Sequence, residues 1–405
     1  MSRQERAGRR SSLKAGTRRW IAAGILAMAW LAGPTDALAQ SAPSSSASGP
    51  AAVGVHFHDQ TALRKEVSEN RYTAGFVTGP PYSTEFAMVQ DIATVLASGQ
   101  ETGPHGEVAL RVLPMVGTGG VRNILDLLTL AGADMAIAPV VLVNRLRDAK
   151  TFGDIRHKLV YITLLHTEEF HLLVRPEIKS LADLAGKTVS LGEEDSAEDV
   201  LGREAFDALG VKINAVNLGL DAALDQLQHG QISAVLLLSG KPIKPLLALN
   251  ARLDDIHFLP IPFSQALQRD FLPSKLEHAD YPNIIADGQR IETVAIQSAL
   301  FAYNWPPHSP RYDLLENFTT SFFSRFSEFL GPDHPAKWHE VNLAARLEGW
   351  ERFRPAGRWL SLQSMGADAG RNGNAGAANP PGNPSEQKEQ LFREFLKWRE
   401  RQQGK

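Results

Sequence analysis

The chain has 405 residues, a formal net charge of −3 at neutral pH and no cysteine. Without cysteine it can form no disulfide, no thiolate metal site, no cysteine nucleophile and no lipidated N-terminal cysteine. No basic patch with interleaved aromatic residues stands out, which argues against nucleic acid as a partner. The length between the terminal segments predicts two structural units.

The N-terminal 39 residues have the pattern of a signal peptide. Basic residues dominate positions 1–19, an apolar run covers residues 20–32, and a small-x-small site ends at Ala39. The apolar run is shorter than the ~20 residues that a membrane-spanning helix needs. We therefore expect cleavage after Ala39 and a periplasmic protein, rather than a membrane anchor or a mitochondrial presequence. Adjacent arginine pairs leave twin-arginine export open.

Cleavage would make the mature chain more acidic. Residues 1–39 contain seven basic and two acidic side chains, so their removal changes the formal charge from −3 to −8. Residues 40–69 follow as a linker that begins with a run of Ser, Ala and Pro and shows no apolar periodicity there.

Strand and helix patterns then alternate twice along the chain. In the first region, strands are predicted at residues 72–77, 108–115 and 134–139, with helical apolar spacing at residues 86–96 and 121–128. In the second, strands are predicted at residues 187–191 and 232–238, with helices from the Ser196 cap to Gly210 and at residues 220–227. Repeated βα units predict a mainly parallel sheet covered by helices.

Two similar α/β halves predict two lobes with a ligand cleft between them, joined near residues 165–172 and 255–265. A return strand is expected at residues 293–302. Four phenylalanines are expected to lie along one helix, at residues 318, 322, 326 and 329, and with Phe323 they are expected to form core rather than an aromatic ligand site. The predicted organisation is signal peptide 1–39, linker 40–69, lobe I 70–165 and 263–330, lobe II 166–262, aromatic extension 331–362, linker 363–385 and amphipathic helix 386–405.

Several short segments, taken in chain order, resemble one known family. They are Gly75–Thr84 (GFVTGPPYST), Gly119–Asn123 (GGVRN), Gly132–Ala138 (GADMAIA), Glu168–Val174 (EEFHLLV), Leu181–Gly192 (LADLAGKTVSLG), Gly230–Pro242 with SGKP at its end, and the pairs Leu272-Pro273 and Tyr281-Pro282. Over about residues 70–330 this order resembles the TAXI class of NMT1-like solute-binding proteins, which serve tripartite ATP-independent (TRAP) transporters.

The resemblance implies a periplasmic binding protein type II fold, here with a C-terminal helical extension. It also implies that a small organic solute binds between the lobes and is delivered to TRAP transporter membrane subunits. Neither a cofactor nor a metal is implied. The ligand contacts that it implies are Thr78, Gly79, Tyr82, Ser83, Gly119, Gly120, Asn123, Glu194, Asp195, Ser196, Gly240 and Lys241.

Some of these positions have alternative interpretations. The turn at Gly119 and Gly120 faces a ligand or is only a tight turn, and it is no dinucleotide fingerprint because Arg122 occupies the last glycine position. Asn123 binds a ligand or caps the backbone. Lys241 pairs with a ligand carboxylate or is an ordinary surface lysine.

Two loops depart from the family pattern. In the first loop, prolines replace glycines and only Tyr82 remains of two adjacent tyrosines. The second loop, residues 192–199, carries five carboxylates at a helix start, where they suit the helix dipole but would repel an anion. Under one interpretation, these carboxylates are the solvated side chains of a helix start. Under the other, Glu194 and Asp195 select a cationic or zwitterionic solute.

Catalytic motifs do not stand out. The sequence has no GxSxG elbow, no P-loop and no zincin motif, and the two histidines of residues 166–171 lack metalloprotease spacing. The expected function is therefore a non-enzymatic solute receptor. The alternative is a ligand-sensing or assembly module of the cell envelope, whose C-terminal helix contacts a partner protein.

Overall fold

The computed structural model describes residues 72–98, 110–249 and 256–373, all of which belong to one compact unit. The predicted signal peptide and C-terminal amphipathic helix lie outside the described residues, and so do most of the two predicted linkers. Among the residues that are described, no helix combines the length and the apolar character needed to cross a bilayer.

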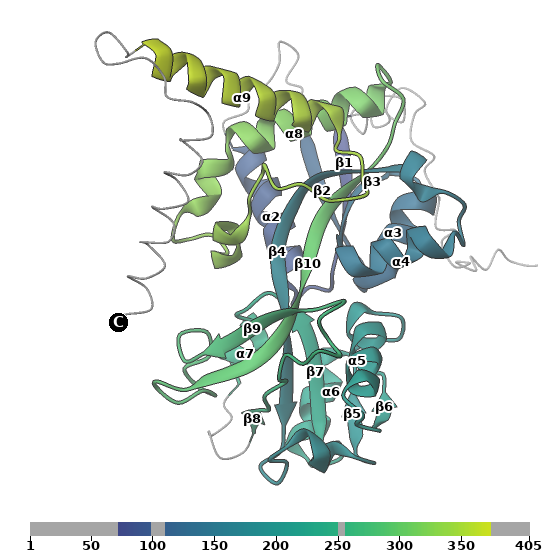
Figure 1. The fold of residues 1–405 in the computed structure, drawn as a ribbon, viewed down its shortest axis with the longest axis vertical. Coiled ribbons are helices and arrows are strands. Elements are labelled where there is room, and N and C mark those ends of the chain that lie inside the picture. Colours follow the sequence, from purple (N-terminus) through teal and green to yellow (C-terminus); the bar gives the residue numbers. More distant parts are fainter. Residues whose placement is uncertain (1–71, 99–109, 250–255, 374–405) are drawn as a thin grey trace, which may run out of the picture. The chain divides into compact units, whose positions relative to one another are not determined.

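One ten-stranded mixed sheet organises these residues (Figure 1). Its strands are β1 (Thr73–Thr78), β2 (Arg111–Val116), β3 (Ala133–Pro139), β4 (Leu159–Val174), β5 (Thr188–Ser190), β6 (Asn214–Val216), β7 (Ala234–Ser239), β8 (His257–Phe258), β9 (Leu272–Glu277) and β10 (Arg290–Tyr303). The main order is β2-β1-β3-β10-β4-β7-β5-β6, with β8 on β4 and β9 on β10. The βα units pair in parallel as predicted, but β4 and β10 run antiparallel to all of their neighbours.

Helices cover both faces of the sheet. The α-helices are α2 (Thr84–Ala97), α3 (Gly120–Thr129), α4 (Val140–Ala149), α5 (Ala197–Ala208), α6 (Leu220–Gln228), α7 (Lys244–Leu247), α8 (Pro310–Ser324) and α9 (Arg354–Gly373). The short 3-10 helices are η1 (Ile155–His157), η2 (Leu181–Leu184), η3 (Phe326–Leu330) and η4 (Ala336–Glu340). The predicted α/β fold class is confirmed by this mixed sheet and its helices, and α8 and α9 follow the last strand of the sheet.

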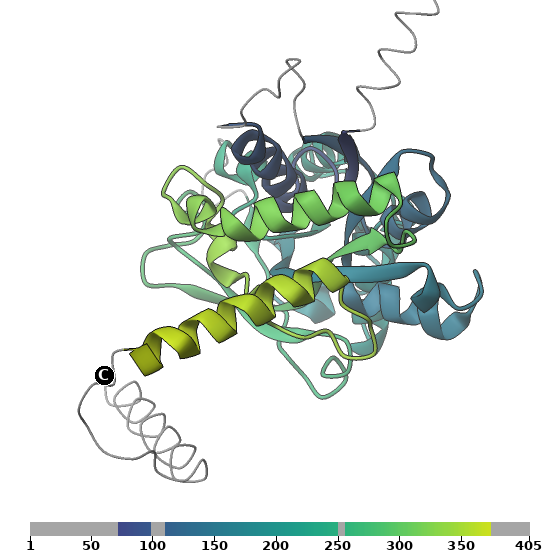
Figure 2. The same cartoon turned by 90° about the horizontal axis from the view of Figure 1, so that it is seen from above.

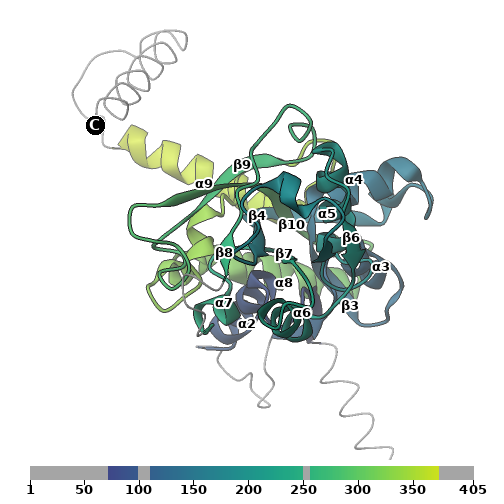
Figure 3. The same ribbon diagram turned by 90° about the horizontal axis from the view of Figure 1, so that it is seen from below.

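Four apolar clusters define two lobes. Lobe I surrounds β2, β1 and β3, with α2 and α8 packed on one face and α3 and α4 on the other. Lobe II surrounds β7, β5 and β6, with α5 on one face and α6 and α7 on the opposite face (Figure 3). Each lobe therefore buries an apolar layer on both sides of its own part of the sheet.

The paired strands β4 and β10 pass from one lobe into the other and form the hinge (Figure 1). Along β4, Leu165 belongs to a lobe I cluster and Phe170 to a lobe II cluster. Along β10, Ile296 packs in lobe II and Ala299 in lobe I, and the β4–β10 register shifts between Gln297 and Ala299. The regular pairing of the two strands is therefore interrupted where the chain changes lobes.

The second crossover therefore lies in β10 and not near residues 255–265. Phe271 packs with α5 in lobe II, while Leu276 and Ile291 pack with α6 in the other lobe II cluster. Residues 263–296 consequently belong to lobe II, although lobe I was predicted from residue 263 onward. The contacts that assign them are made with residues far away in the sequence, so local periodicity carried no sign of them.

The C-terminal part of the described chain packs on lobe I. Trp338 and Phe353 lie in the same apolar cluster as Phe318 and Phe322, and α9 lies beside α8 (Figure 2). Four of the five phenylalanines are buried core residues as predicted, and Phe326 is partly buried against the same cluster. They do not share one helix, because α8 ends at Ser324 and Phe326 and Phe329 lie in η3. Helix α9 continues beyond residue 362, into the start of the predicted second linker.

Candidate functional site

The lobes meet where three helices begin. Helices α2 and α3 of lobe I and α5 of lobe II start at this junction, and a Cβ added at Gly120 would lie 2.8 Å from the backbone nitrogen of Ala197. Thr84 also joins the lobes: its backbone N–H donates to Ser239 Oγ over 3.0 Å, and its hydroxyl donates to Gly240 O over 2.6 Å. We name this junction the interlobe site.

Three carboxyl groups are buried in the interlobe site, one from each part of the fold. Glu85 lies in the first turn of α2, Glu168 in the hinge strand β4 and Glu198 in the first turn of α5, and at most 4% of each is exposed. Glu85 is hydrogen bonded to Glu168, and Glu168 also accepts a hydrogen bond from Ser298 of β10. These three residues form the carboxyl cluster. In the part of the chain that the structure describes, none of them forms an ion pair with a basic side chain.

Burial dominates the electrostatics of the carboxyl cluster. It raises the pKa of Glu168 and that of Glu198 from 4.5 to about 7, and it raises the pKa of Glu85 well above its usual range. Neighbouring acids add to these increases, since Glu198 acts on both other members and Glu193 acts on Glu198. The helix N-termini oppose them, because their partial positive charge favours a carboxylate. At neutral pH the cluster therefore holds protons unless a positive group takes their place.

The predicted contacts of the first loop border this cluster. Thr78 is fully buried at the end of β1, and its hydroxyl donates to Gly79 O over 2.8 Å. A side chain at Gly79 would collide with the carboxylate of Glu85. Ser83 caps the start of α2. Tyr82 belongs to this lobe I loop but packs against the apolar core of lobe II, and burial raises the pKa of its hydroxyl.

The glycine turn before α3 is held by a side chain of that helix. Asn123 is fully buried; its Oδ1 accepts from the Gly119 backbone N–H over 3.2 Å, and its Nδ2 donates to Ile137 O over 2.9 Å. Of the two roles predicted for Asn123, the structure shows the one that braces the backbone. Gly119 and Gly120 have φ values of 83° and 64°, which favour glycine.

The acids of the second loop are arranged differently from the expectation. Glu194 and Asp195 are exposed, whereas Glu198 reaches the interlobe site. Ser196 caps α5 as predicted, by accepting from the Asp199 backbone N–H over 3.2 Å. Side chains of a helix lean toward its N-terminus, so a residue in the first turn of α5 points toward the junction.

The loop after β7 contributes its backbone to the junction. The carbonyl of Gly240 accepts from Thr84, as described above. The ammonium of Lys241 instead pairs with Asp280 over 2.9 Å and donates to Lys275 O over 2.7 Å, both in lobe II. The sequence had suggested either a pair with a ligand carboxylate or an ordinary surface lysine for Lys241, and neither alternative included this ion pair within lobe II.

Glu85, Glu168 and Glu198 were not among the predicted contacts. Glu168 lies in the crossover segment that carries the family resemblance, and Glu198 lies in the acidic loop. Both segments had been singled out in the sequence, although these two residues had not been chosen as ligand contacts. Glu85 showed no signal except its place next to the first loop. Only the fold brings the three together.

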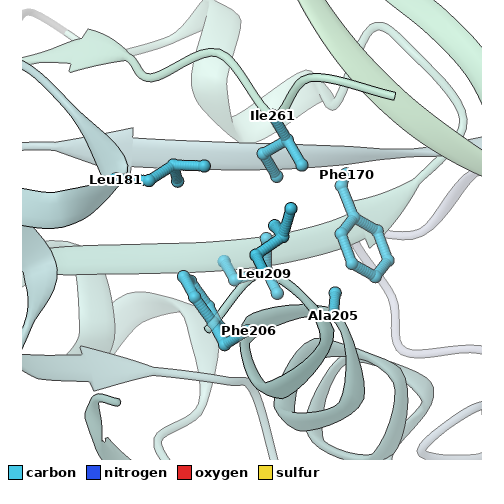
Figure 4. Close-up of a pocket in the computed structure, with 7 residues that line it drawn as sticks. Phe170, Leu181, Ala205, Phe206, Leu209 and Ile261 are labelled. Carbon is cyan, nitrogen blue, oxygen red and sulfur yellow. The ribbon is translucent and has the colours of Figure 1, made fainter. Parts of the chain in front are cut away.

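An apolar void inside lobe II is a weaker candidate for a site (Figure 4). It measures about 10 Å³, close to the minimum for one water molecule, and it lies between α5 and the sheet. Its lining is Phe170, Leu181, Ala205, Phe206, Leu209, Leu236 and Ile261. Without a polar group to orient a ligand, this void is a packing defect rather than a binding site.

Gly120 offers a direct test of the contact between the lobes. In Gly120→Ala the new methyl group meets the backbone of Ala197, so the lobes are expected to move apart. Gly119→Ala is the control, because Gly119 also has a positive φ but nothing lies within 4 Å of the added Cβ. X-ray scattering should give a larger radius of gyration for Gly120→Ala only. An equal change in both variants would mean that backbone strain, not the clash, is responsible.

The sequence matches the NMT1-like family over residues 76–336, which is more than half of the chain. The protein belongs to this family. No curated protein sequence matches it.

Among solved structures, the fold is similar to holo ArgBP from T. maritima, with 14% identity over 64% of this chain and 92% of that chain and a TM-score of 0.37. It is also similar to two proteins of Streptococcus pneumoniae. One is an ABC uptake transporter substrate-binding protein with bound histidine, with 12% identity, coverage of 71% and 100%, and a TM-score of 0.40. The other is an amino acid ABC transporter substrate-binding protein bound to L-arginine, with 15% identity, coverage of 68% and 98%, and a TM-score of 0.38.

Proposed function

We propose that this protein is a periplasmic solute receptor without enzymatic activity, which binds a small organic solute at the interlobe site. The observation that carries this proposal is the meeting of three helix N-termini and three buried carboxyl groups where the lobes of an NMT1-like protein come together. Ligands of open α/β folds bind in such a place, where loops at the strand ends converge.

Closure follows from the position of the carboxyl cluster. Glu85 belongs to lobe I, Glu168 to the hinge and Glu198 to lobe II, so a solute that contacts all three does so only when the lobes are together. A ligand that binds the closed form better than the open form shifts the population toward the closed form. The closed receptor then presents a surface that differs from that of the open one.

The charge of the site favours a solute with a positive group. An ammonium near the carboxyl cluster would replace the protons that burial otherwise retains, and it would form charge-assisted hydrogen bonds. The proposed solute is therefore still cationic or zwitterionic, as expected from the acidic loop. The residues proposed to bind it are now Glu198 and the other two members of the carboxyl cluster, in place of Glu194 and Asp195.

Thermal shifts of the mature chain test this assignment. The panel comprises amino acids, polyamines, dicarboxylates and short monocarboxylates, and a solute at a hundredfold excess over Kd adds about 2.7 kcal/mol of stability. We expect a shift with amines or amino acids and none with dicarboxylates. Glu198→Gln should raise Kd at least tenfold, which lowers the stabilisation at the same solute concentration to about 1.4 kcal/mol or less. The exposed control Glu194→Gln should leave Kd unchanged. A shift with dicarboxylates alone would refute the cationic class.

Export and partner follow from the same proposal. A signal peptide cleaved after Ala39 would deliver the protein to the periplasm, and, as a TAXI-class receptor, it would dock on TRAP transporter membrane subunits. Co-purification with those subunits in the presence of solute tests the partnership. The alternative, a sensor or assembly module, predicts that deletion of residues 374–405 abolishes capture of a partner protein while leaving solute affinity intact.

A further inference from the structure

A segment after α8 and η3 connects lobe I to the hinge and to lobe II. It comprises residues 331–353, named the C-terminal strap, and includes η4. Trp338 anchors the strap in lobe I: it is fully buried, and its Nε1 donates to Asp91 Oδ2 of α2 over 2.7 Å. Further along, the strap pairs with β4, since the backbone N–H of Phe353 donates to Tyr161 O over 2.8 Å.

The strap reaches the hinge through one buried lysine. Lys337 is 3% exposed, and its Nζ lies 2.7 Å from Glu169 Oε1 of β4 and 2.7 Å from Glu340 Oε1 of the strap. Glu340 in turn accepts hydrogen bonds from the backbone N–H of Thr167 over 3.0 Å and from its hydroxyl over 2.8 Å. Two strap side chains therefore bind the hinge strand at Glu169 and at Thr167, which lie two residues apart on β4.

Glu169 also contacts lobe II. Its second oxygen, Oε2, accepts from the backbone N–H of Lys241 over 3.1 Å, in the loop after β7. The same loop touches the strap directly, because a Cβ added at Gly240 would lie 3.0 Å from Lys337 Cγ. One buried ion pair thus contacts lobe I through the strap, the hinge through β4 and lobe II through the loop.

We propose that the C-terminal strap holds the angle between the lobes, with the Lys337–Glu169 pair as the connection that opening of the hinge must break or distort. The family match ends at residue 336, so the pair depends on a residue just beyond the matched part of the chain. This inference does not depend on the nature of the solute, because all of the contacts are made by the protein itself.

Spin labels on the two lobes test the proposal in the full mature chain. The protein has no cysteine, so Thr129→Cys on α3 and Asp207→Cys on α5 introduce two unique labelling positions, both exposed. The interlobe distance is measured by pulsed electron resonance in the labelled parent, in Lys337→Met and in the double variant Glu169→Gln with Lys337→Met. The double variant removes both charges, and so avoids leaving a buried carboxylate unpaired.

The double variant is expected to stay folded and to show a population at longer distance. Its ratio of open to closed forms should rise within the roughly 5- to 150-fold range typical of coupling between sites. Lys337→Arg, which keeps the charge, should resemble the parent. The control Lys275→Met with Glu277→Gln removes the ion pairs that Glu277 forms with Lys275 and Arg290 inside lobe II, and it should leave the interlobe distance unchanged. An unchanged distance in the folded double variant would overturn the proposal, and so would its failure to fold, which would make the pair a requirement of the core.

Discussion

Replacing Glu168 and Glu198 with glutamine is expected to make the protein more stable at about pH 8, by roughly 3 kcal/mol for each carboxyl removed. Both side chains are almost fully buried, and burial raises the pKa of each from 4.5 to about 7. Glutamine has nearly the same size and never ionises, so the variant avoids the cost of a buried negative charge.

The sign of the pH dependence follows from linkage. A carboxyl with a raised pKa binds its proton more tightly in the folded than in the unfolded protein, so its contribution is fully present below pH 4.5 and is lost as the pH rises through about 7. Two histidines act in the opposite direction. Burial lowers the pKa of His166 and that of His171 to about 3, so the folded state loses stability as the pH falls below 6.5.

Because these effects overlap, the informative quantity is the difference between the variant and the parent. Urea unfolding at several values between about pH 4 and pH 8 should give a difference near zero at the acid end and a growing advantage of the variant above it. The exposed substitution Glu194→Gln should show no such trend. A difference that does not change with pH would mean that the two carboxyl groups are solvated in solution.

Local features of the fold could be predicted from the sequence. The six strands predicted from the sequence lie within a few residues of their observed ends, and Ser196 was recognised as the cap of α5, whereas β4, β6, β8 and β9 were not predicted. Such features depend on neighbouring residues: a hydroxyl at a helix start accepts from the backbone N–H three residues later. Apolar periodicity likewise reports which face of a helix or strand is buried.

The features that set the site depend on contacts between distant residues. Glu85 and Glu198 are more than a hundred positions apart, and nothing near either one indicates that both face the same junction. The acidic loop drew attention to Glu194 and Asp195, which are exposed, whereas Glu198 of the same segment is buried, since sequence alone does not show which side chains of a loop turn inward. The second crossover was misplaced for the same reason, because Ile291 joins lobe II through residues of α6.

Trp338→Ala should have the largest effect of any substitution outside the interlobe site. The indole is fully buried against three phenylalanines, the nearest being Phe329 at 4.6 Å between ring centres, and its Nε1 donates to Asp91. Loss of a buried tryptophan typically costs about 3–5 kcal/mol, because the apolar contacts are lost and a cavity remains. Urea unfolding followed by circular dichroism measures the change without depending on tryptophan fluorescence.

Two controls separate the packing of Trp338 from its hydrogen bond and from its position in the strap. Trp338→Phe keeps most of the apolar contact and should cost much less, mainly the bond to Asp91, worth about 1.5–3 kcal/mol. Trp359→Ala, on the partly exposed α9, should cost less than Trp338→Ala. Since Trp338 adjoins Lys337, its loss should also free the strap, and the interlobe distance should lengthen as it does without the Lys337–Glu169 pair. A loss of stability without that change in distance would mean that Lys337 holds the hinge independently of its anchor in lobe I.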